Sequence, residues 1–405
     1  MELLLDLSQP IAADWRNDEP DLAVDDASVE ARYSSGEVRI VTEQSRTQLA
    51  ELPAILASDR YEMQPDFQRR HRWDRTRQSR LIESFIMNVP VPPIFLYEYE
   101  YSRYEVMDGL QRLTAIKEFY AGEFPLEGLE HWPELNGRTY GTLPPQLQQA
   151  IDRRHISSVV LLRETAKDAE SAQNLKQLVF ERINSGGIEL TDQESRNALS
   201  SGPLNDILPR LARTPSFCRL WSLPEPEGGA DDTQDPGAEL LADPRFQRME
   251  DVEMVLRFFA QPYRHQEGAP RKLKKLLDTF WRVANDMSSV EEIETVGKVF
   301  VESCDLAEEL LGENAFYLRR ERGGKMEWIK KPTLLAYDTV MAALSDLLDR
   351  RDEMIENREQ IQGAIMSLYD ENPNAFDGRR TDPQDLKKRE DLVRDSILHV
   401  LGSGG

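Results

Sequence analysis

The stretch Tyr104-Glu105-Val106-Met107-Asp108-Gly109-Leu110-Gln111-Arg112 decides how the centre of this chain folds. Its first four residues predict a short strand, and Asp108-Gly109 predicts a tight turn. The following segment, Leu110 to Ala121, is typical of a helix that Gly122 closes. Such a turn leaves the first backbone N–H groups of the helix unpaired, and Arg112 lies within its first turn. The pattern therefore predicts an anion site, suited to phosphate, at the helix start.

Arginine is concentrated upstream, at positions 69, 70, 72, 75, 77 and 80. Its planar guanidinium donates paired hydrogen bonds to phosphate and keeps its charge. The run 67–80 has two functional interpretations, a triphosphate clamp or a nucleic-acid contact, and a structural one, a solvated helical face paired with acidic residues. We expect Gln68, Arg69 and Arg72 to face the pocket. We expect Arg75, Arg77 and Arg80 to be exposed, where with Arg72 they are the weaker candidates for nucleic-acid binding.

Composition limits the classes of protein. The 405 residues carry a net charge of −23, which argues against wrapping nucleic acid with the whole surface and favours a small polyanion or a short nucleic-acid segment. Two distant cysteines, Cys218 and Cys304, exclude a disulfide framework and fit a reducing cytoplasm, so we expect a cytoplasmic protein. We expect no signal peptide and no membrane partner, because no apolar run approaches the ~20 residues that span a bilayer.

Periodicity and composition divide the chain into an α+β pocket domain followed by an all-α helical domain. Asp74 is a candidate N-cap for a helix whose apolar face is Leu81, Ile82, Phe85, Ile86 and Val89. Strands are predicted over 94–97, 104–107 and 156–162, and long helices over most of 246–401. The predicted regions are an acidic leader at 1–42, the pocket domain at 43–222, an exposed acidic linker at 223–244 and the helical domain at 245–405.

Several sequence blocks, in this order along residues 60–200, resemble a known family. They are Pro65-Asp66-Phe67-Gln68-Arg69, Trp73, Leu81-Ile82-Glu83-Ser84, Pro92-Pro93-Ile94-Phe95-Leu96, Met107-Asp108-Gly109-Leu110-Gln111-Arg112-Leu113-Thr114, Phe180-Glu181-Arg182-Ile183-Asn184-Ser185-Gly186-Gly187 and Glu194-Ser195-Arg196-Asn197-Ala198. The pattern resembles the N-terminal domain family of GmrSD-type restriction endonucleases, also found in phosphorothioate-sensing anti-phage proteins. That resemblance implies a ParB/sulfiredoxin-like nucleotide-pocket fold.

The resemblance also implies site residues. The family's Asp-Gly-x-Gln-Arg element is associated with binding and hydrolysis of nucleoside triphosphates, and Leu110 stands here where the commoner form has Gln. By this resemblance the catalytic candidates are Asp108, Gln111 and Arg112. The nucleotide- or phosphate-binding candidates are Gln68, Arg69, Gly109, Arg112, Arg182 and Asn184.

The roles of two site residues stay open. Asp108 could cap the helix, bind Mg²⁺ together with substrate phosphates, or position water. Gln111 could orient an attacking water or be a solvated helix residue. Full-length restriction members carry a second, HNH-type nuclease domain. The five histidines here are too scattered for such a site, so we expect a standalone form that acts with a separate nuclease or effector.

The leading hypothesis is a component of a DNA restriction or anti-phage defence system that binds a nucleoside triphosphate, hydrolyses it with Mg²⁺, and acts as a sensor or switch for a partner effector. DNA, including modified DNA, is a second expected partner, and an oligomer is compatible with the sequence. One alternative is a non-enzymatic sensor of modified DNA or of a nucleotide. Another is a metal-dependent nuclease with carboxylates from the helical domain. Mg²⁺-dependent phosphate release would separate the first two.

Overall fold

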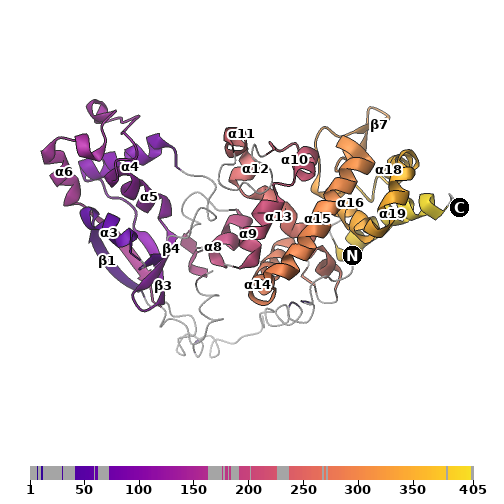
Figure 1. The fold of residues 1–405 in the computed structure, drawn as a ribbon, viewed down its shortest axis with the longest axis horizontal. Helices are drawn as coiled ribbons and strands as arrows, with labels where there is room; N and C mark the ends of the chain where they lie inside the picture. The colour runs from indigo at the N-terminus through magenta and orange to yellow at the C-terminus, as the bar shows by residue number, and fades with distance from the viewer. Residues whose placement is uncertain are drawn as a thin grey trace. The chain divides into compact units, whose positions relative to one another are not determined.

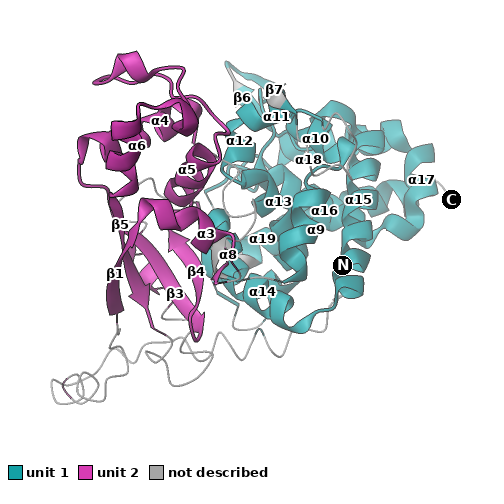
Figure 2. Cartoon of the chain, turned by 60° about the vertical axis from the view of Figure 1, so that its left-hand side comes forward, with its two compact units in different colours: residues 1–20, 192–405 teal, residues 21–191 magenta. Residues whose placement is uncertain are grey.

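The structure is a computed structural model in which the chain forms two compact units (Figure 2). Residues 21–191 form the sheet unit, and residues 1–20 with 192–405 form the helical unit. The described residues are 7, 11, 30, 42–58, 60–62, 73–162, 176, 178–180, 182–183, 191–200, 202–225, 237–266, 269–270, 272–379 and 382–402.

The described part of the sheet unit contains a five-stranded mixed sheet. Its order is β1-β5-β3-β4-β2, with β5–β3 and β4–β2 parallel and β1–β5 and β3–β4 antiparallel. The strands are β1 Thr42–Gln48, β2 Tyr61–Glu62, β3 Ile94–Glu100, β4 Arg103–Asp108 and β5 His155–Leu161. The strands predicted from residues 94, 104 and 156 onward are therefore confirmed.

Helices pack on this sheet and share one hydrophobic core with it (Figure 1). The helices are η1 Leu49–Glu51, α3 Leu52–Leu56, α4 Arg75–Met87, α5 Leu110–Tyr120, η2 Pro133–Leu135, η3 Tyr140–Thr142 and α6 Pro145–Asp152. Asp74 caps α4 as predicted, accepting a hydrogen bond from the Arg77 N–H at 2.7 Å. The prediction that Val89 belongs to the apolar face is wrong, because α4 ends at Met87, its C-cap Asn88 is in the left-handed region, and Val89 is 47% exposed.

The helical unit begins earlier than the sequence predicts. Its boundary with the sheet unit falls between Thr191 and Asp192, rather than at the expected 222/223. The reason is packing. Helix α8 Asp192–Leu199 contacts α13 and α14, α9 Pro203–Leu211 contacts α13, α14 and α15, and α10 Pro215–Trp221 contacts α15.

The remaining elements of the helical unit are α11 Ala238–Ala242, α12 Pro244–Gln247, α13 Glu250–Ala260, η5 Gln261–His265, α14 Leu273–Met287, α15 Val290–Leu311, η6 Gly312–Asn314, β6 Arg319–Arg322, β7 Lys325–Trp328, α16 Leu334–Asp346, η7 Leu348–Arg350, α17 Arg351–Glu356, α18 Arg358–Glu371 and α19 Pro383–Gly402. The expectation of an all-α domain is wrong at β6–β7, a hairpin whose turn residues Gly323 and Gly324 both have positive φ. In the described residues no helix is both long and apolar enough to cross a bilayer.

Both cysteines are buried in the core of this unit. Burial raises the pKa of the Cys218 thiol to about 11, although Arg213 nearby opposes the shift. Burial, reinforced by Asp305, raises the pKa of Cys304 well above its usual value. Both side chains therefore stay as neutral thiols at physiological pH.

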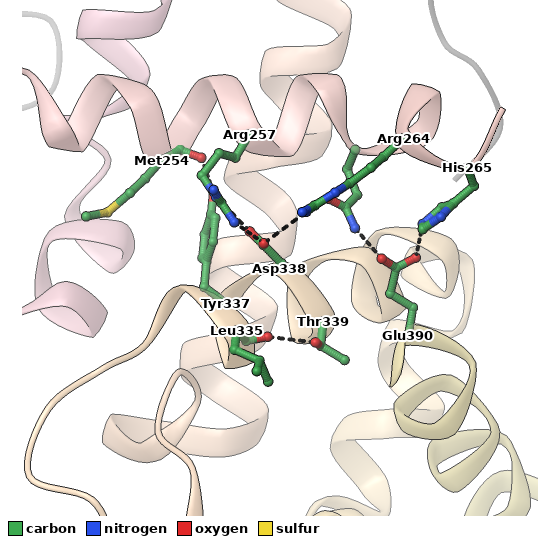
Figure 3. A network of polar contacts seen from close by, with 10 residues as sticks. Met254, Arg257, Arg264, His265, Leu335, Tyr337, Asp338, Thr339 and Glu390 are labelled. Atoms are coloured by element: carbon green, nitrogen blue, oxygen red, sulfur yellow. Dashed lines mark hydrogen bonds and ion pairs between the residues drawn. The ribbon is translucent and has the colours of Figure 1, made fainter. Parts of the chain in front are cut away.

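A buried polar network ties α13 and η5 to α16 and α19 (Figure 3). The Asp338 carboxylate accepts hydrogen bonds from Arg257, at 3.0 Å from its Nε, and from Arg264, at 3.5 Å. Glu390 accepts from Gln261 and contacts the His265 ring at 2.8 Å. Burial alone would lower the pKa of Arg257, but the Asp338 carboxylate outweighs it and raises that pKa. Arg257 is thus a buried cation whose direct counter-ion is Asp338, with Glu253 adding to the rise of its pKa.

We expect Asp338→Asn to lower the free energy of unfolding of the helical unit by about 3–5 kcal/mol, because it leaves the Arg257 charge buried without its counter-ion. Urea denaturation measures this loss. A matched control is Glu309→Gln, which breaks the exposed Arg351–Glu309 pair and costs about 1 kcal/mol or less. Equal losses in the two variants would contradict a central role for Asp338.

Candidate functional site

The turn between β4 and α5 requires a backbone conformation that favours glycine. Gly109 has φ +96°, in the left-handed region that residues with a Cβ rarely adopt. A Cβ added there would lie 2.5 Å from Cγ2 of Ile94, a buried residue at the start of β3. The turn predicted from Asp108-Gly109 is thus present and is packed directly against the neighbouring strand.

The Arg112 side chain folds back over this turn. Its Nη2 donates to the Asp108 carboxylate at 2.8 Å and to the Pro93 carbonyl oxygen at 3.2 Å. The Arg112 side chain is 14% exposed and that of Asp108 23%. Among the described residues, the buried Arg112 Nε has no hydrogen-bond partner. The guanidinium is therefore held in place, and its Nε–H remains able to donate a hydrogen bond to a ligand.

Helix α5 begins without a side-chain cap. Its N-cap is Gly109, which has no side chain, and the Leu113 N–H bonds the Gly109 carbonyl at 2.9 Å. No described residue accepts a hydrogen bond from the N–H of Leu110, Gln111 or Arg112. Asp108 therefore does not cap the helix, and one of its three interpretations is excluded. The free N–H groups and the adjacent guanidinium are the donors that anion sites at helix starts use.

Gln111 is a buried structural link rather than a solvated residue. Its Oε1 accepts the backbone N–H of Trp73 at 3.1 Å, so the first turn of α5 holds the chain that enters α4. Sequence reasoning missed this bond, because 38 residues separate its partners. The Gln68 and Arg69 candidates come a few residues before Trp73 in the chain. Gln68, Arg69, Arg72 and Asn184 lie outside the described residues.

The described arginines of α4 are exposed, as expected, and each has an intramolecular partner. Arg75 pairs with Glu118 at 2.6 Å and lies over the Phe124 ring. Arg80 pairs with Glu130 at 2.6 Å. The Arg77 guanidinium stacks on Trp73, 4.7 Å from the ring centroid. These contacts favour the interpretation of a solvated face paired with acidic residues.

A buried ion pair on β4 was not anticipated. Lys176 Nζ lies 2.6 and 2.8 Å from the two carboxylate oxygens of Glu105, and both side chains are less than a tenth exposed. Burial raises the pKa of Glu105, while Lys176 opposes that shift. Arg182, a phosphate-binding candidate that follows Lys176 in the chain, is exposed and helical, as is the backbone of its neighbour Ile183. No local signal could reveal a pair whose residues are 71 positions apart.

Asp108 is a chemically reasonable ligand for Mg²⁺, which proteins commonly hold with one or two carboxylates and the phosphates of the substrate. Its carboxylate is partly exposed beside the uncapped helix start. Within the described ranges, no group of three or more His, Cys, Asp or Glu side chains forms a complete metal site. Any Mg²⁺ bound here would therefore depend on the phosphate oxygens of the nucleotide.

Residues 52–201 match the family described as the GmrSD restriction endonuclease N-terminal domain. The match contains the β4–α5 turn and extends ten residues past the end of the sheet unit. No curated protein and no solved structure matches the chain.

Gly109→Ala tests the turn. The left-handed backbone should cost about 1–2 kcal/mol in free energy of unfolding, and the overlap with Ile94 roughly 1–3 kcal/mol more. The matched control is Gly122→Ala, where φ is +74° but no atom lies within 4 Å of the added Cβ, so only the first cost applies. Urea denaturation of both variants measures the difference. Equal costs would show that Ile94 yields to the new methyl group.

Proposed function

We propose that this chain binds a nucleoside triphosphate at the β4–α5 turn, in a ParB/sulfiredoxin-like pocket. Bound nucleotide, and its hydrolysis, would switch a partner effector in a DNA restriction or anti-phage defence system. The observation that carries this proposal is the uncapped start of α5 with Arg112 fixed beside it. The family match of residues 52–201 supports the assignment to defence.

Binding would use donors already at the turn. The N–H groups of the first turn of α5 and the Arg112 guanidinium would bond phosphate oxygens, as charge-assisted donors do at such sites. Asp108 currently balances the charge of Arg112. A bound phosphate would replace Asp108 as the ion-pair partner of Arg112, so the Asp108 carboxylate would become available to bind Mg²⁺. Mg²⁺, bound by Asp108 and phosphate oxygens, would neutralise part of the phosphate charge.

A switch follows from the bond between Gln111 and Trp73. Gln111 stands in the turn of helix that would bind phosphate, and its Oε1 holds the backbone N–H before α4. A small shift of this turn on binding would reach the segment upstream of Trp73. That segment contains Gln68 and Arg69, the other predicted nucleotide contacts.

The same bond favours a second candidate function, a sensor without turnover. Gln111 is buried and its Oε1 accepts the Trp73 N–H, so this side chain is held by a structural bond. That bond competes with the orientation of an attacking water, the role that glutamine has in some phosphoryl-transfer sites. In this form the domain would bind the nucleotide and signal occupancy alone.

We expect wild-type protein with Mg²⁺ to bind at least one of ATP, GTP, CTP and UTP in calorimetric titration. Arg112→Ala should weaken binding by roughly 10- to 100-fold, the value of a hydrogen bond to a charged group. Lys117→Ala removes an exposed cation from the same helix and should leave affinity unchanged. Absence of binding by wild type would refute the proposal. Binding without phosphate release would establish the sensor.

Asp108→Asn should separate the two roles of this carboxylate. Without Mg²⁺, the variant should bind nucleotide more tightly than wild type, because Arg112 loses its competing anion. With Mg²⁺, it should lose the stimulation that metal gives to wild type. Titrations with and without Mg²⁺ measure both effects. Identical metal dependence in the two proteins would remove Asp108 from the set of metal ligands.

A further inference from the structure

The β6–β7 hairpin and the lysines after it form a basic surface in an acidic protein. Between Arg319 and Lys331, six basic and two acidic residues give a local charge of +4, while the whole chain carries −23. We call residues 319–331 the basic hairpin. It belongs to the helical unit, whereas the proposed nucleotide site belongs to the sheet unit.

One face of the basic hairpin is anchored to α18. Arg319 donates to the Asp370 carboxylate at 2.7 and 3.1 Å and lies over the Trp328 ring, its partner in register. Trp328 in turn meets the Tyr369 ring edge-on, with ring centroids 6.3 Å apart. These contacts fix one face of the hairpin to α18.

The opposite face carries cations. In the antiparallel register Arg320 lies opposite Glu327 and Lys325 opposite position 322, so the side chains of Arg320, Lys325 and Glu327 share the face away from Arg319 and Trp328. The side chains of Arg320 and Lys325 are exposed. Arg320 donates to the Asp377 carbonyl oxygen, at 3.3 Å. This face therefore presents positive charge around a Gly-Gly turn.

The lysines of the basic hairpin differ from the arginines of α4 in having no counter-ion among the described residues. Lys325, Lys330 and Lys331 are exposed, and none forms an ion pair with a described residue. On α4, Arg75 and Arg80 are each paired with a glutamate. Surface cations that are not paired within the protein can neutralise phosphates and so release the cations condensed around a nucleic acid, which favours binding to that polyanion.

We propose that the basic hairpin binds the phosphate backbone of duplex DNA. A two-stranded ribbon fits the major groove of B-form DNA, whereas the major groove of duplex RNA is too narrow to admit it. Lys325 at the start of β7, and Lys330 and Lys331 just after it, would contact phosphates without reading sequence. The rest of the acidic surface would repel DNA, so contact is confined to this hairpin.

The test is fluorescence anisotropy of a labelled DNA duplex with full-length protein over a range of salt concentrations. We expect the variant Lys325→Ala/Lys330→Ala/Lys331→Ala to bind at least roughly tenfold more weakly at low salt. The slope of log K against log salt should fall by about 0.9 for each phosphate that the variant no longer neutralises. All three lysines are exposed, so thermal unfolding should be unchanged.

The matched control is Lys272→Ala/Lys298→Ala/Lys387→Ala, which removes the same charge from exposed positions outside the basic hairpin. It should keep the wild-type affinity and salt slope. Equal weakening in both triple variants would overturn the proposal in favour of a general charge effect. Wild-type binding to single-stranded DNA or polyglutamate but not to the duplex would also overturn it. Nucleotide binding by the hairpin variant is measured in a separate titration. Loss of DNA binding by this variant, with nucleotide binding intact, supports the hairpin as the DNA site and does not contradict the proposed nucleotide site.

Discussion

The candidate site depends on one constraint, the left-handed backbone of Gly109 pressed against Ile94. That conformation sends the chain from the end of β4 directly into α5, with no side chain available to cap the helix. It also brings Asp108 and Arg112 to the two sides of the turn, where they meet at 2.8 Å. The uncapped N–H groups, the guanidinium and the carboxylate are thus consequences of a single backbone conformation.

Interactions between neighbours in sequence were predictable, and those between distant residues were not. The turn at 108–109, the Asp74 cap and the helix closing at Gly122 follow from local residue preferences. The Gln111–Trp73 and Lys176–Glu105 contacts depend on tertiary packing between residues far apart in sequence, which local sequence patterns do not predict. The unit boundary was misplaced because composition marks an exposed connection after residue 222, whereas the core is decided by the apolar faces of α8 to α10.

Acidic residues serve two purposes in this chain. In the sheet unit, Glu118 and Glu130 neutralise arginines of α4 that sequence alone presented as candidates for nucleic-acid binding. In the helical unit, Asp338 and Glu390 hold buried basic groups between helices (Figure 3). Much of the arginine content is therefore structural. The basic groups of functional interest are Arg112, which pairs with Asp108 beside an uncapped helix start, and the exposed lysines 325, 330 and 331, which have no counter-ion among the described residues.

The burial of Cys218 and Cys304 has a practical consequence for spectroscopy. Both thiols are enclosed in the helical unit and stay protonated, and the chain contains no other cysteine. Maleimide dyes react with exposed thiolates, so we expect the folded native chain to take up almost no dye. A single cysteine introduced on the surface of the sheet unit would then take the label selectively. The native protein thus serves as its own cysteine-free background, with no need to disturb the helical core.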